Sequence, residues 1–88
     1  MNVRYLRFFL RDLERLKDKK TKQQVKAHIQ KIKAAQQLSE ITQLKKLKGH
    51  PCAYRIRIGN YRMGVFIEND CVTFARFVKR NDIYKLFP

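Results

Sequence analysis

The chain contains little of what would mark a disulfide-rich, metal-bound or membrane-spanning protein. Among its 88 residues there are only two cysteines, two prolines, three glycines and no tryptophan. Cys52 and Cys71 are too few for a disulfide framework and lie in no Cys/His spacing typical of zinc, so we expect two reduced, partly buried thiols, no metal and no cofactor. No apolar run approaches the roughly 20 residues of a membrane span. Arg4, Arg7 and Arg11 interrupt any signal-peptide core, so we expect a cytoplasmic protein.

Acidic residues are scarce as well. Seven Asp and Glu stand against 21 Lys and Arg, which gives a formal net charge of +14. Such an excess repels itself within a compact fold, but it favours binding to a polyanion. Nucleic acid is the first candidate partner, and an acidic protein or an anionic membrane surface are the others. Many lysines of the first half, such as Lys17 and Lys22, are interpreted as a solvated basic surface.

Two helices are predicted in the first half of the chain. Leucines at positions 10, 13 and 16 indicate a short amphipathic helix. A second helix is predicted to begin at Thr21, which with Gln24 matches a capping box, and to run to about Gln37. Its apolar face is formed by Val25, Ile29 and Ile32. A short polar link joins the two helices, so they are expected to form an antiparallel hairpin that packs onto a sheet.

Strands are predicted on both sides of this hairpin. Asn2 to Phe8 reads as a strand, and Leu38 to Lys48 as either a ragged helical turn or an extended connector. Three further strands follow: Ala53 to Ile58, Tyr61 to Ile67 and Cys71 to Val78. A short helical turn is expected from Asn81 to Phe87. The order is β-α-α-β-β-β, which predicts an α+β fold in a single domain over residues 1–88.

The strands from 53 to 67 carry the chain's most informative pattern, because they alternate apolar residues with arginines. If Gly59-Asn60 forms a two-residue hairpin loop, Arg57 stands directly opposite Arg62, and Arg55 opposite Gly64. Like charges directly opposite each other destabilise a sheet, so this pair indicates a bound phosphate. Gly64 is expected to leave open surface for a close approach of the ligand. Arginine suits the role because its planar fork donates two parallel hydrogen bonds to a phosphate.

The two faces of the hairpin are therefore predicted to differ: one apolar face covered by the helices, and one basic groove. Arg80 and Tyr84 follow the last strand and are expected to fold back over this groove. Arg76 is ambiguous, because a tight Asn69-Asp70 turn places it beside Met63 and not beside Arg62. Single arginines on an exposed sheet face are common and mostly solvated, but four near one hairpin, with a tyrosine, favour a polyanion site. The apolar face consists of Tyr54, Ile56, Ile58, Met63, Val65 and Ile67.

Three segments then resemble a known family. They are Leu47-Lys48-Gly49, the strand–turn–strand from Tyr54 to Arg62, and Lys79-Arg80-Asn81-Asp82-Ile83-Tyr84. Together they resemble the RelE/ParE superfamily of bacterial toxins from type II toxin–antitoxin pairs, and the resemblance covers nearly the whole chain. It implies a twisted antiparallel sheet with a helical hairpin on one side.

In the RelE-like branch, the resemblance implies metal-independent cleavage of messenger RNA, usually in the ribosomal A site. The positions that match the branch's catalytic set are Arg55, Arg57, Arg62, Arg80 and Tyr84. Lys48 and Lys79 flank them and are expected to contact RNA. The resemblance also implies a small acidic antitoxin as partner, in a complex that allows a heterotetramer, and an antitoxin segment that covers the groove or displaces the Tyr84 region.

The expected chemistry is attack of a 2′-hydroxyl on the adjacent phosphorus, which gives a 2′,3′-cyclic phosphate and a 5′-hydroxyl. Arg62 and Arg55 are the candidates for stabilising the phosphoryl oxygens, Arg80 for the leaving oxygen and Tyr84 for orienting the nucleotide. The best-known members carry lysines at the positions of Arg55 and Arg57, and an arginine is a poor general base. Either electrostatics and positioning carry catalysis, or another group accepts the proton.

His50 is the only histidine near the set, and it is interpreted as a loop residue before Pro51. His28 lies on the predicted second helix and is interpreted as structural. Two other functions stay open. One is a ParE-like inhibitor of DNA gyrase with the same fold and no nuclease activity, although that branch generally lacks the basic set. The other is a nucleic-acid-binding or partner-binding module without activity.

Overall fold

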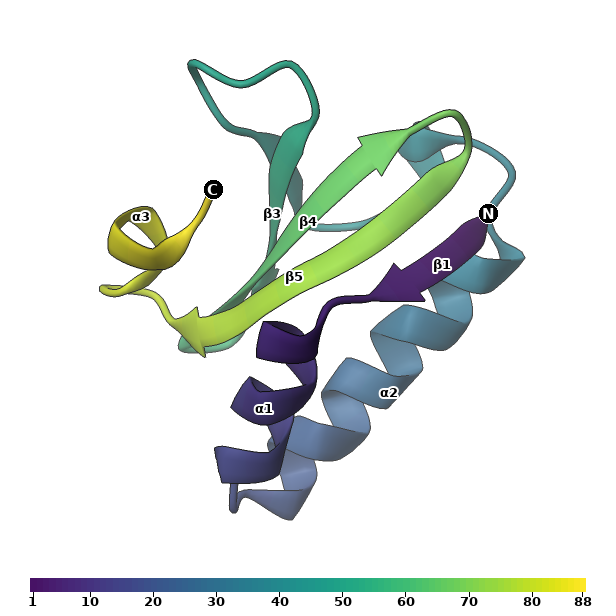
Figure 1. Ribbon diagram of the computed structural model, residues 1–88. Coiled ribbons are helices and arrows are strands. Elements are labelled where there is room, and N and C mark those ends of the chain that lie inside the picture. The colour runs from purple at the N-terminus through teal and green to yellow at the C-terminus, as the bar shows by residue number, and fades with distance from the viewer.

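A five-stranded sheet forms the middle of the molecule, with a pair of helices on one face and a short C-terminal helix on the other (Figure 1). The computed structural model describes residues 1–88. The strands are β1 (Asn2–Tyr5), β2 (Leu44–Lys46), β3 (Ala53–Ile58), β4 (Tyr61–Glu68) and β5 (Cys71–Lys79). The helices are α1 (Arg7–Arg15), α2 (Lys19–Ala34) and α3 (Ile83–Leu86), with one 3₁₀ turn at Leu38–Glu40. The predicted α+β fold with an N-terminal helical hairpin is confirmed.

The strand order is β1-β5-β4-β3-β2, and it corrects the predicted sheet in two respects. First, β1 pairs with β5 in parallel, with Asn2 opposite Cys71, so the sheet is mixed and not wholly antiparallel. Second, the ambiguous connector contains an additional edge strand, β2, which pairs with β3. With three residues, β2 is too short to show an alternating pattern. The positive φ of Gln43 (61°) directs the chain into it.

The second helix begins earlier than predicted. Its N-cap is Asp18, whose carboxylate accepts hydrogen bonds from the backbone N–H of Lys20 at 3.0 Å and from the hydroxyl of Thr21 at 2.7 Å. The predicted capping box of Thr21 and Gln24 is therefore wrong, because an Asp caps a helix at least as well as a Thr. The first strand, predicted from Asn2 to Phe8, is shorter than expected: it ends at Tyr5, and α1 begins at Arg7.

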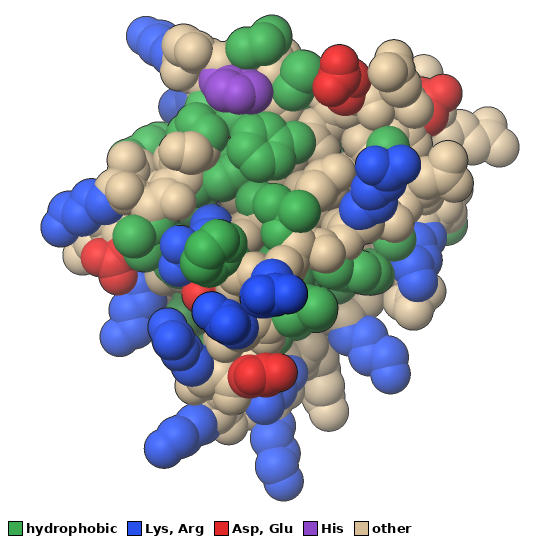
Figure 2. All heavy atoms as spheres, in the orientation of Figure 1, with side chains coloured by type: hydrophobic (Ala, Val, Ile, Leu, Met, Phe, Trp, Pro, Cys, Tyr) green, Lys and Arg blue, Asp and Glu red, His purple; other side chains and the backbone are tan.

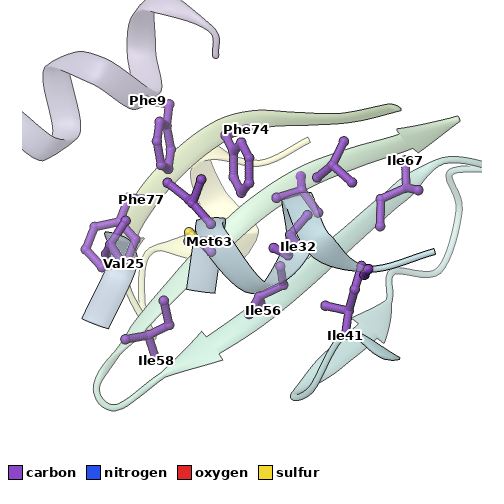
Figure 3. Close-up of a cluster of buried hydrophobic side chains, with 14 of the residues drawn as sticks. Phe9, Val25, Ile32, Ile41, Ile56, Ile58, Met63, Ile67, Phe74 and Phe77 are labelled. Carbon is purple, nitrogen blue, oxygen red and sulfur yellow. The ribbon is translucent and has the colours of Figure 1, made fainter. Parts of the chain in front are cut away.

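The helical hairpin covers an apolar face of the sheet, as predicted (Figure 3). Ile56, Met63 and Val65 are completely buried there, and β3 and β4 bring them together. The contribution of α2 to this core comes from Val25, Ile29 and Ile32. The contribution of α1 comes from Phe9, which is fully buried and packs at a ring distance of 5.3 Å on Phe74. By contrast, Leu10, one of the three leucines that indicated this helix, is 47% exposed.

The opposite face of the sheet carries a second, smaller apolar cluster that the sequence analysis did not predict. It consists of Leu47, Ala53, Ala75, Ile83 and Phe87. The ring of Phe87 packs directly over Gly64, where an added β-carbon would lie 2.5 Å from Cγ of the phenyl ring. Gly64 therefore does not leave open surface for a ligand, which corrects that prediction. It makes room for the C-terminal segment, and this contact fixes α3 on the sheet.

A β-bulge in β5 changes the position predicted for Arg76. Gly64 pairs with Arg76 and Val65 with Phe74, so Ala75 is the extra residue of the bulge. Arg76 therefore lies beside Gly64 and not beside Met63. Its guanidinium reaches α1, where Nε donates to Oδ2 of Asp12 at 2.8 Å and Nη2 donates to Oδ1 at 3.2 Å. The same carboxylate accepts from the backbone N–H of Phe77 at 2.9 Å, so Asp12 fixes α1 to β5 at the bulge.

Cys52 and Cys71 are unpaired and half-buried. None of the helices combines the length and the apolar character needed to cross a bilayer. No three His, Cys, Asp or Glu side chains lie together in a group that could hold a metal ion.

Candidate functional site

The hairpin of β3 and β4 brings the predicted arginines together with the predicted register. Arg57 is paired with Arg62, and Arg55 with Gly64. The loop is Gly59-Asn60, and Gly59 has the positive φ (56°) that the first loop residue of a type II′ turn requires. Two arginines therefore stand opposite each other on the face of the sheet that the helical hairpin leaves uncovered.

Arg62 is the buried member of this pair, with 6% of its surface exposed, whereas Arg57 is exposed. Nη1 of Arg62 donates to the carbonyl oxygens of Gly59 and Tyr61, both at 2.9 Å. Those two bonds hold the guanidinium against the hairpin turn. Both use Nη1, so the N–H groups on Nε and Nη2 are left for a ligand.

The electrostatic environment of Arg62 lacks a compensating anion. Burial lowers the pKa of its guanidinium, and the positive charges of Arg55, Arg57 and Arg80 lower it further, while Tyr84 acts in the opposite direction. Each of these positive neighbours raises the free energy of the charged form. A bound phosphate would reverse the effect, because it would supply the negative charge that the protein does not provide here.

Tyr84 closes one side of the site, as predicted. It lies on α3 and is 65% exposed, and its hydroxyl oxygen accepts a hydrogen bond from Nε of Arg55 at 3.3 Å. A helix of four residues has little stability of its own. Ile83 and Phe87, at 0% and 3% exposure, attach α3 to the second apolar cluster and so place the phenol beside the arginines.

Arg80 and Lys79 lie at the other end of the site, beside the hairpin turn. Both side chains are exposed, and the backbone N–H of Arg80 donates to the carbonyl of Asn60 at 2.8 Å. Together with Asn60, Tyr61 and Asn81 they line an open hollow of about 530 Å³. The structure therefore brings Arg80 into the electrostatic range of Arg62. Lys79 is paired with Tyr61, which packs on the helix-side core, so the structure does not place Lys79 on the face that carries Arg62.

Lys48 lies on the opposite flank, and the structure adds Lys45 there, which sequence reasoning missed. Lys45 and Lys46 belong to β2, and with Lys48, Tyr84 and Phe87 they border a hollow of about 370 Å³. Lys45 is paired with Arg55 across the sheet edge, so the basic face continues onto β2. The sequence does show a lysine-rich stretch from 45 to 48. Because no strand was predicted there, these lysines could not be assigned to a face of the sheet. Figure 2 shows Lys and Arg side chains around the edge and across the lower half of this face, with hydrophobic and uncharged surface in its upper middle part and acidic side chains at several places.

The two histidines have structural contacts, in agreement with their interpretation from the sequence. Nδ1 of His50 accepts a hydrogen bond from the backbone N–H of Cys52 at 3.1 Å, and its ring packs 5.4 Å from that of Phe66. Nδ1 of His28 lies 3.1 Å from the carbonyl oxygen of Gln24, one turn earlier on α2. Neither histidine has a hydrogen bond to the arginines.

Another hollow of the molecule lies elsewhere, between α1 and α2. It measures about 560 Å³, and its apolar lining includes Leu10, Leu13, Val25 and Ile29, with lysines around it. It contains none of the arginines from β3, β4 or the segment after β5. We therefore place the candidate chemistry at the arginine site, where buried and exposed cations converge with an exposed phenol, and not in this groove.

Comparison with known proteins identifies the family. No protein-family model matches the chain. The chain is 33% identical to Toxin RelE3 of Methanocaldococcus jannaschii over 89 residues, which cover 100% of both proteins. Its fold is similar to a solved chain from the RelB-RelE antitoxin-toxin complex of Methanococcus jannaschii, with a TM-score of 0.82 and 30% identity over 97% of this chain and 99% of that chain.

A more distant structure has the same fold. The intact RelBE toxin-antitoxin complex of E. coli contains a chain with a TM-score of 0.70 and 17% identity, over 89% of this chain and 94% of that one. At this identity the likeness concerns the fold alone, whereas the archaeal relative matches in sequence over its whole length. By that full-length similarity, the chain belongs to the RelE family of toxins.

Proposed function

We propose that the protein is the toxin of a type II toxin–antitoxin system and acts as an endoribonuclease on messenger RNA at the ribosome. The observation that carries the proposal is Arg62, a buried guanidinium with two unused donor nitrogens and three further arginines around it. A polyanionic ligand would balance this charge. The family membership directs the choice among polyanions towards messenger RNA.

The reaction begins with attack of a ribose 2′-hydroxyl on the adjacent phosphorus. The 2′-oxygen–phosphorus bond forms, the bond to the 5′-oxygen breaks, and the products carry a 2′,3′-cyclic phosphate and a 5′-hydroxyl. Negative charge accumulates on the non-bridging oxygens during this step, and fixed cations stabilise it. Arg62 and Arg55 are assigned to these oxygens. Arg80 is assigned to the departing 5′-oxygen, which takes up a proton from water to become the 5′-hydroxyl.

Arg57 and Tyr84 are assigned to substrate positioning. Arg57 is exposed next to Arg62 and suits a flanking phosphate, while the exposed ring of Tyr84 suits stacking on a base. Arginine holds its proton at neutral pH, so this site favours charge stabilisation over general base catalysis. Deprotonation of the 2′-hydroxyl is assigned to solvent or to an RNA group on the ribosome.

An antitoxin partner is part of the proposal. The structural relative from Methanococcus jannaschii belongs to a RelB-RelE antitoxin-toxin complex, and a net charge of +14 suits an acidic partner. We expect an acidic antitoxin segment to cover the arginines or to displace α3, and two copies of each chain to form a heterotetramer. Either contact would prevent RNA from reaching Arg62.

The test is expression of the chain from an inducible promoter, with primer extension on a reporter message. New cleavage sites in translated messages together with growth arrest are expected. Arg55 is partly buried and Arg80 is exposed. Arg55→Ala and Arg80→Ala should each relieve the arrest. Loss of one preorganised donor lowers a rate by about a hundredfold to a thousandfold.

The control variant is Lys31→Ala, an exposed lysine on α2. It should arrest growth as the parent does. Arrest with intact messages, combined with inhibition of purified DNA gyrase in a supercoiling assay, would replace the nuclease proposal by a ParE-like function. Binding of RNA without arrest or cleavage would reduce the protein to a nucleic-acid-binding module.

A further inference from the structure

The turn between β3 and β4 provides hydrogen-bond acceptors for two of the arginines at the candidate site. Nη1 of Arg62 donates to the carbonyl oxygens of Gly59 and Tyr61, both at 2.9 Å. The backbone N–H of Arg80 donates to the carbonyl oxygen of Asn60 at 2.8 Å. Three consecutive carbonyl groups of one turn therefore bind the two arginines.

The two bonds to Arg62 leave its guanidinium little freedom of orientation. A guanidinium is planar, so holding Nη1 between two acceptors also fixes the direction of the edge formed by Nε and Nη2. The residue is only 6% exposed, so packing restricts it further. The N–H groups that remain for a phosphate are thus oriented before any ligand binds. A donor that is already oriented stabilises developing charge without a further rearrangement.

These bonds are not needed to form the hairpin. A two-residue loop with glycine at its first position is a favoured hairpin turn by its backbone geometry alone. The positive charges of the neighbouring arginines raise the free energy of charged Arg62, and a neutral donor would satisfy the same carbonyl groups without that repulsion. An arginine at this position therefore indicates that the direction of its free edge has a use.

Gly59 determines where its own carbonyl group points. Its φ of 56° lies in the left-handed region, and a β-carbon added there would meet no other atom within 4 Å. An alanine at this position is therefore disfavoured by its backbone conformation and not by a clash. If the chain relaxes to a negative φ, the peptide planes on both sides of residue 59 rotate, and the carbonyl oxygen turns away from Arg62.

We propose that Gly59 is a positioning residue: the turn that it allows directs the free edge of the Arg62 guanidinium and sets the spacing between Arg62 and Arg80. The consequence for catalysis rests on the proposed ribonuclease function, in which these two arginines are assigned to different oxygens of the reacting phosphate. The orientation of Arg62 does not depend on that function and can be measured without RNA.

The first experiment is nuclear magnetic resonance of the guanidinium groups in the ¹⁵N-labelled chain without RNA. Two hydrogen bonds to Nη1 should slow rotation of the Arg62 guanidinium, so separate signals are expected for its Nη1 and Nη2 protons, while exposed Arg57 gives averaged ones. Gly59→Ala should merge the Arg62 signals. Averaged Arg62 signals in the parent chain would overturn the proposal, whether or not the variant folds.

The second experiment is single-turnover cleavage of a defined message on programmed ribosomes, with the concentration of the chain varied. Gly59→Ala should lower the maximal rate on the order of a hundredfold, the effect of a displacement of about 1 Å, and change the half-maximal concentration less than about twofold. Gly59→Asn should keep most of the rate, because asparagine is common in turns of this class.

The matched control is Asn69→Ala in the turn between β4 and β5. Asn69 also has a positive φ (51°), but it lies at the other end of β4 from Arg62. This variant should lower the melting temperature as Gly59→Ala does and leave both the Arg62 signals and the maximal rate unchanged.

Equal losses of rate for Gly59→Ala and Asn69→Ala would overturn the proposal, because lost stability alone explains them. A weaker half-maximal concentration at an unchanged maximal rate would also overturn it. Merged Arg62 signals in Gly59→Ala, with a parent chain that cuts no message, would support the positioning role and contradict the proposed nuclease function. The two proposals therefore fail separately.

Discussion

The ring of Phe87 occupies the space that a side chain at position 64 would need. A β-carbon on Gly64 would lie 2.5 Å from Cγ of Phe87, closer than real β-carbons approach other heavy atoms. This contact between the middle of β4 and the end of the chain is what attaches α3, and with it Tyr84, to the face that carries the arginines.

Gly64→Ala is therefore expected to displace the C-terminal segment. Because the added methyl group forces the phenyl ring away, the free energy of unfolding should fall by roughly 1–3 kcal/mol, the range for overpacking. Hydrogen exchange should accelerate over residues 83–87, while β3 and β4 stay protected. Chemical denaturation and exchange measured by mass spectrometry check both effects.

The double variant Gly64→Ala/Phe87→Ala provides the control. If the clash is the cause, Gly64→Ala costs much less in the Phe87→Ala background, because the two positions are in contact and their effects are not additive. An equal cost in both backgrounds would show that Gly64 serves another purpose.

Arg57→Gln is expected to stabilise the fold and weaken the function. Arg57 is exposed and stands opposite the buried Arg62, and replacing one member of such a pair should raise the free energy of unfolding by roughly 0.2–1 kcal/mol. The gain should shrink as salt is added, since salt screens the repulsion. Lys31→Gln, on α2, should change stability little. A destabilised Arg57→Gln would show that the pair is not repulsive in the free protein.

Asp12→Ala is expected to release α1 from the bulge of β5. The carboxylate is 7% exposed and accepts hydrogen bonds from Arg76 and from the backbone N–H of Phe77. Its removal leaves the Arg76 charge, itself 20% exposed, without a partner, at a cost of roughly 2–4 kcal/mol. Denaturation midpoints measure the loss. Asp12→Ala combined with Arg76→Met should recover part of it, and an unchanged midpoint in the single variant would contradict this role.

Asp18 should contribute a pH-dependent part of the stability. The side-chain hydrogen bond from Thr21 is the main cause that lowers its pKa below the ordinary value of 3.8, with backbone N–H groups adding to it. At pH values above its ordinary pKa, a carboxyl whose pKa is lowered by folding stabilises the folded state. This stabilisation is lost as the pH falls through the lowered pKa. Thermal melts between neutral pH and about pH 2 should show a smaller acid loss for Asp18→Asn, which keeps an N-cap oxygen but does not titrate. Identical profiles would exclude the contribution.

The β3–β4 hairpin was the part of the fold that the sequence predicted best. The short loop at Gly59 fixes the register, and a fixed register decides the pairing of Arg57 with Arg62 without knowledge of the rest of the molecule. The face of α2 that carries Val25 and Ile32 was predictable for a similar reason, because helical periodicity is local.

The features that were missed depend on contacts distant in sequence. The pairing of Lys45 with Arg55 needs β2 to be recognised as a strand, and three residues carry no periodicity. The contact of Phe87 with Gly64 joins the end of α3 to the middle of β4. Because these segments are far apart in the sequence, the contact could not be foreseen, and Gly64 was interpreted as open surface. The bulge at Ala75 has no local sequence signal, and it alone moved Arg76 by one position in the pairing.

The central claim is that Arg62 stabilises the charge that develops when RNA is cut by its own 2′-hydroxyl. The most direct test supplies the purified chain to ribosomes programmed with a defined message and analyses the ends of the products. Fragments with a 2′,3′-cyclic phosphate and a 5′-hydroxyl are predicted, with a rate about a hundredfold to a thousandfold lower for a folded Arg62→Lys variant, whose single ammonium cannot reproduce the fixed fork. Fragments with 5′-phosphate ends, or equal rates for the two proteins, would contradict it.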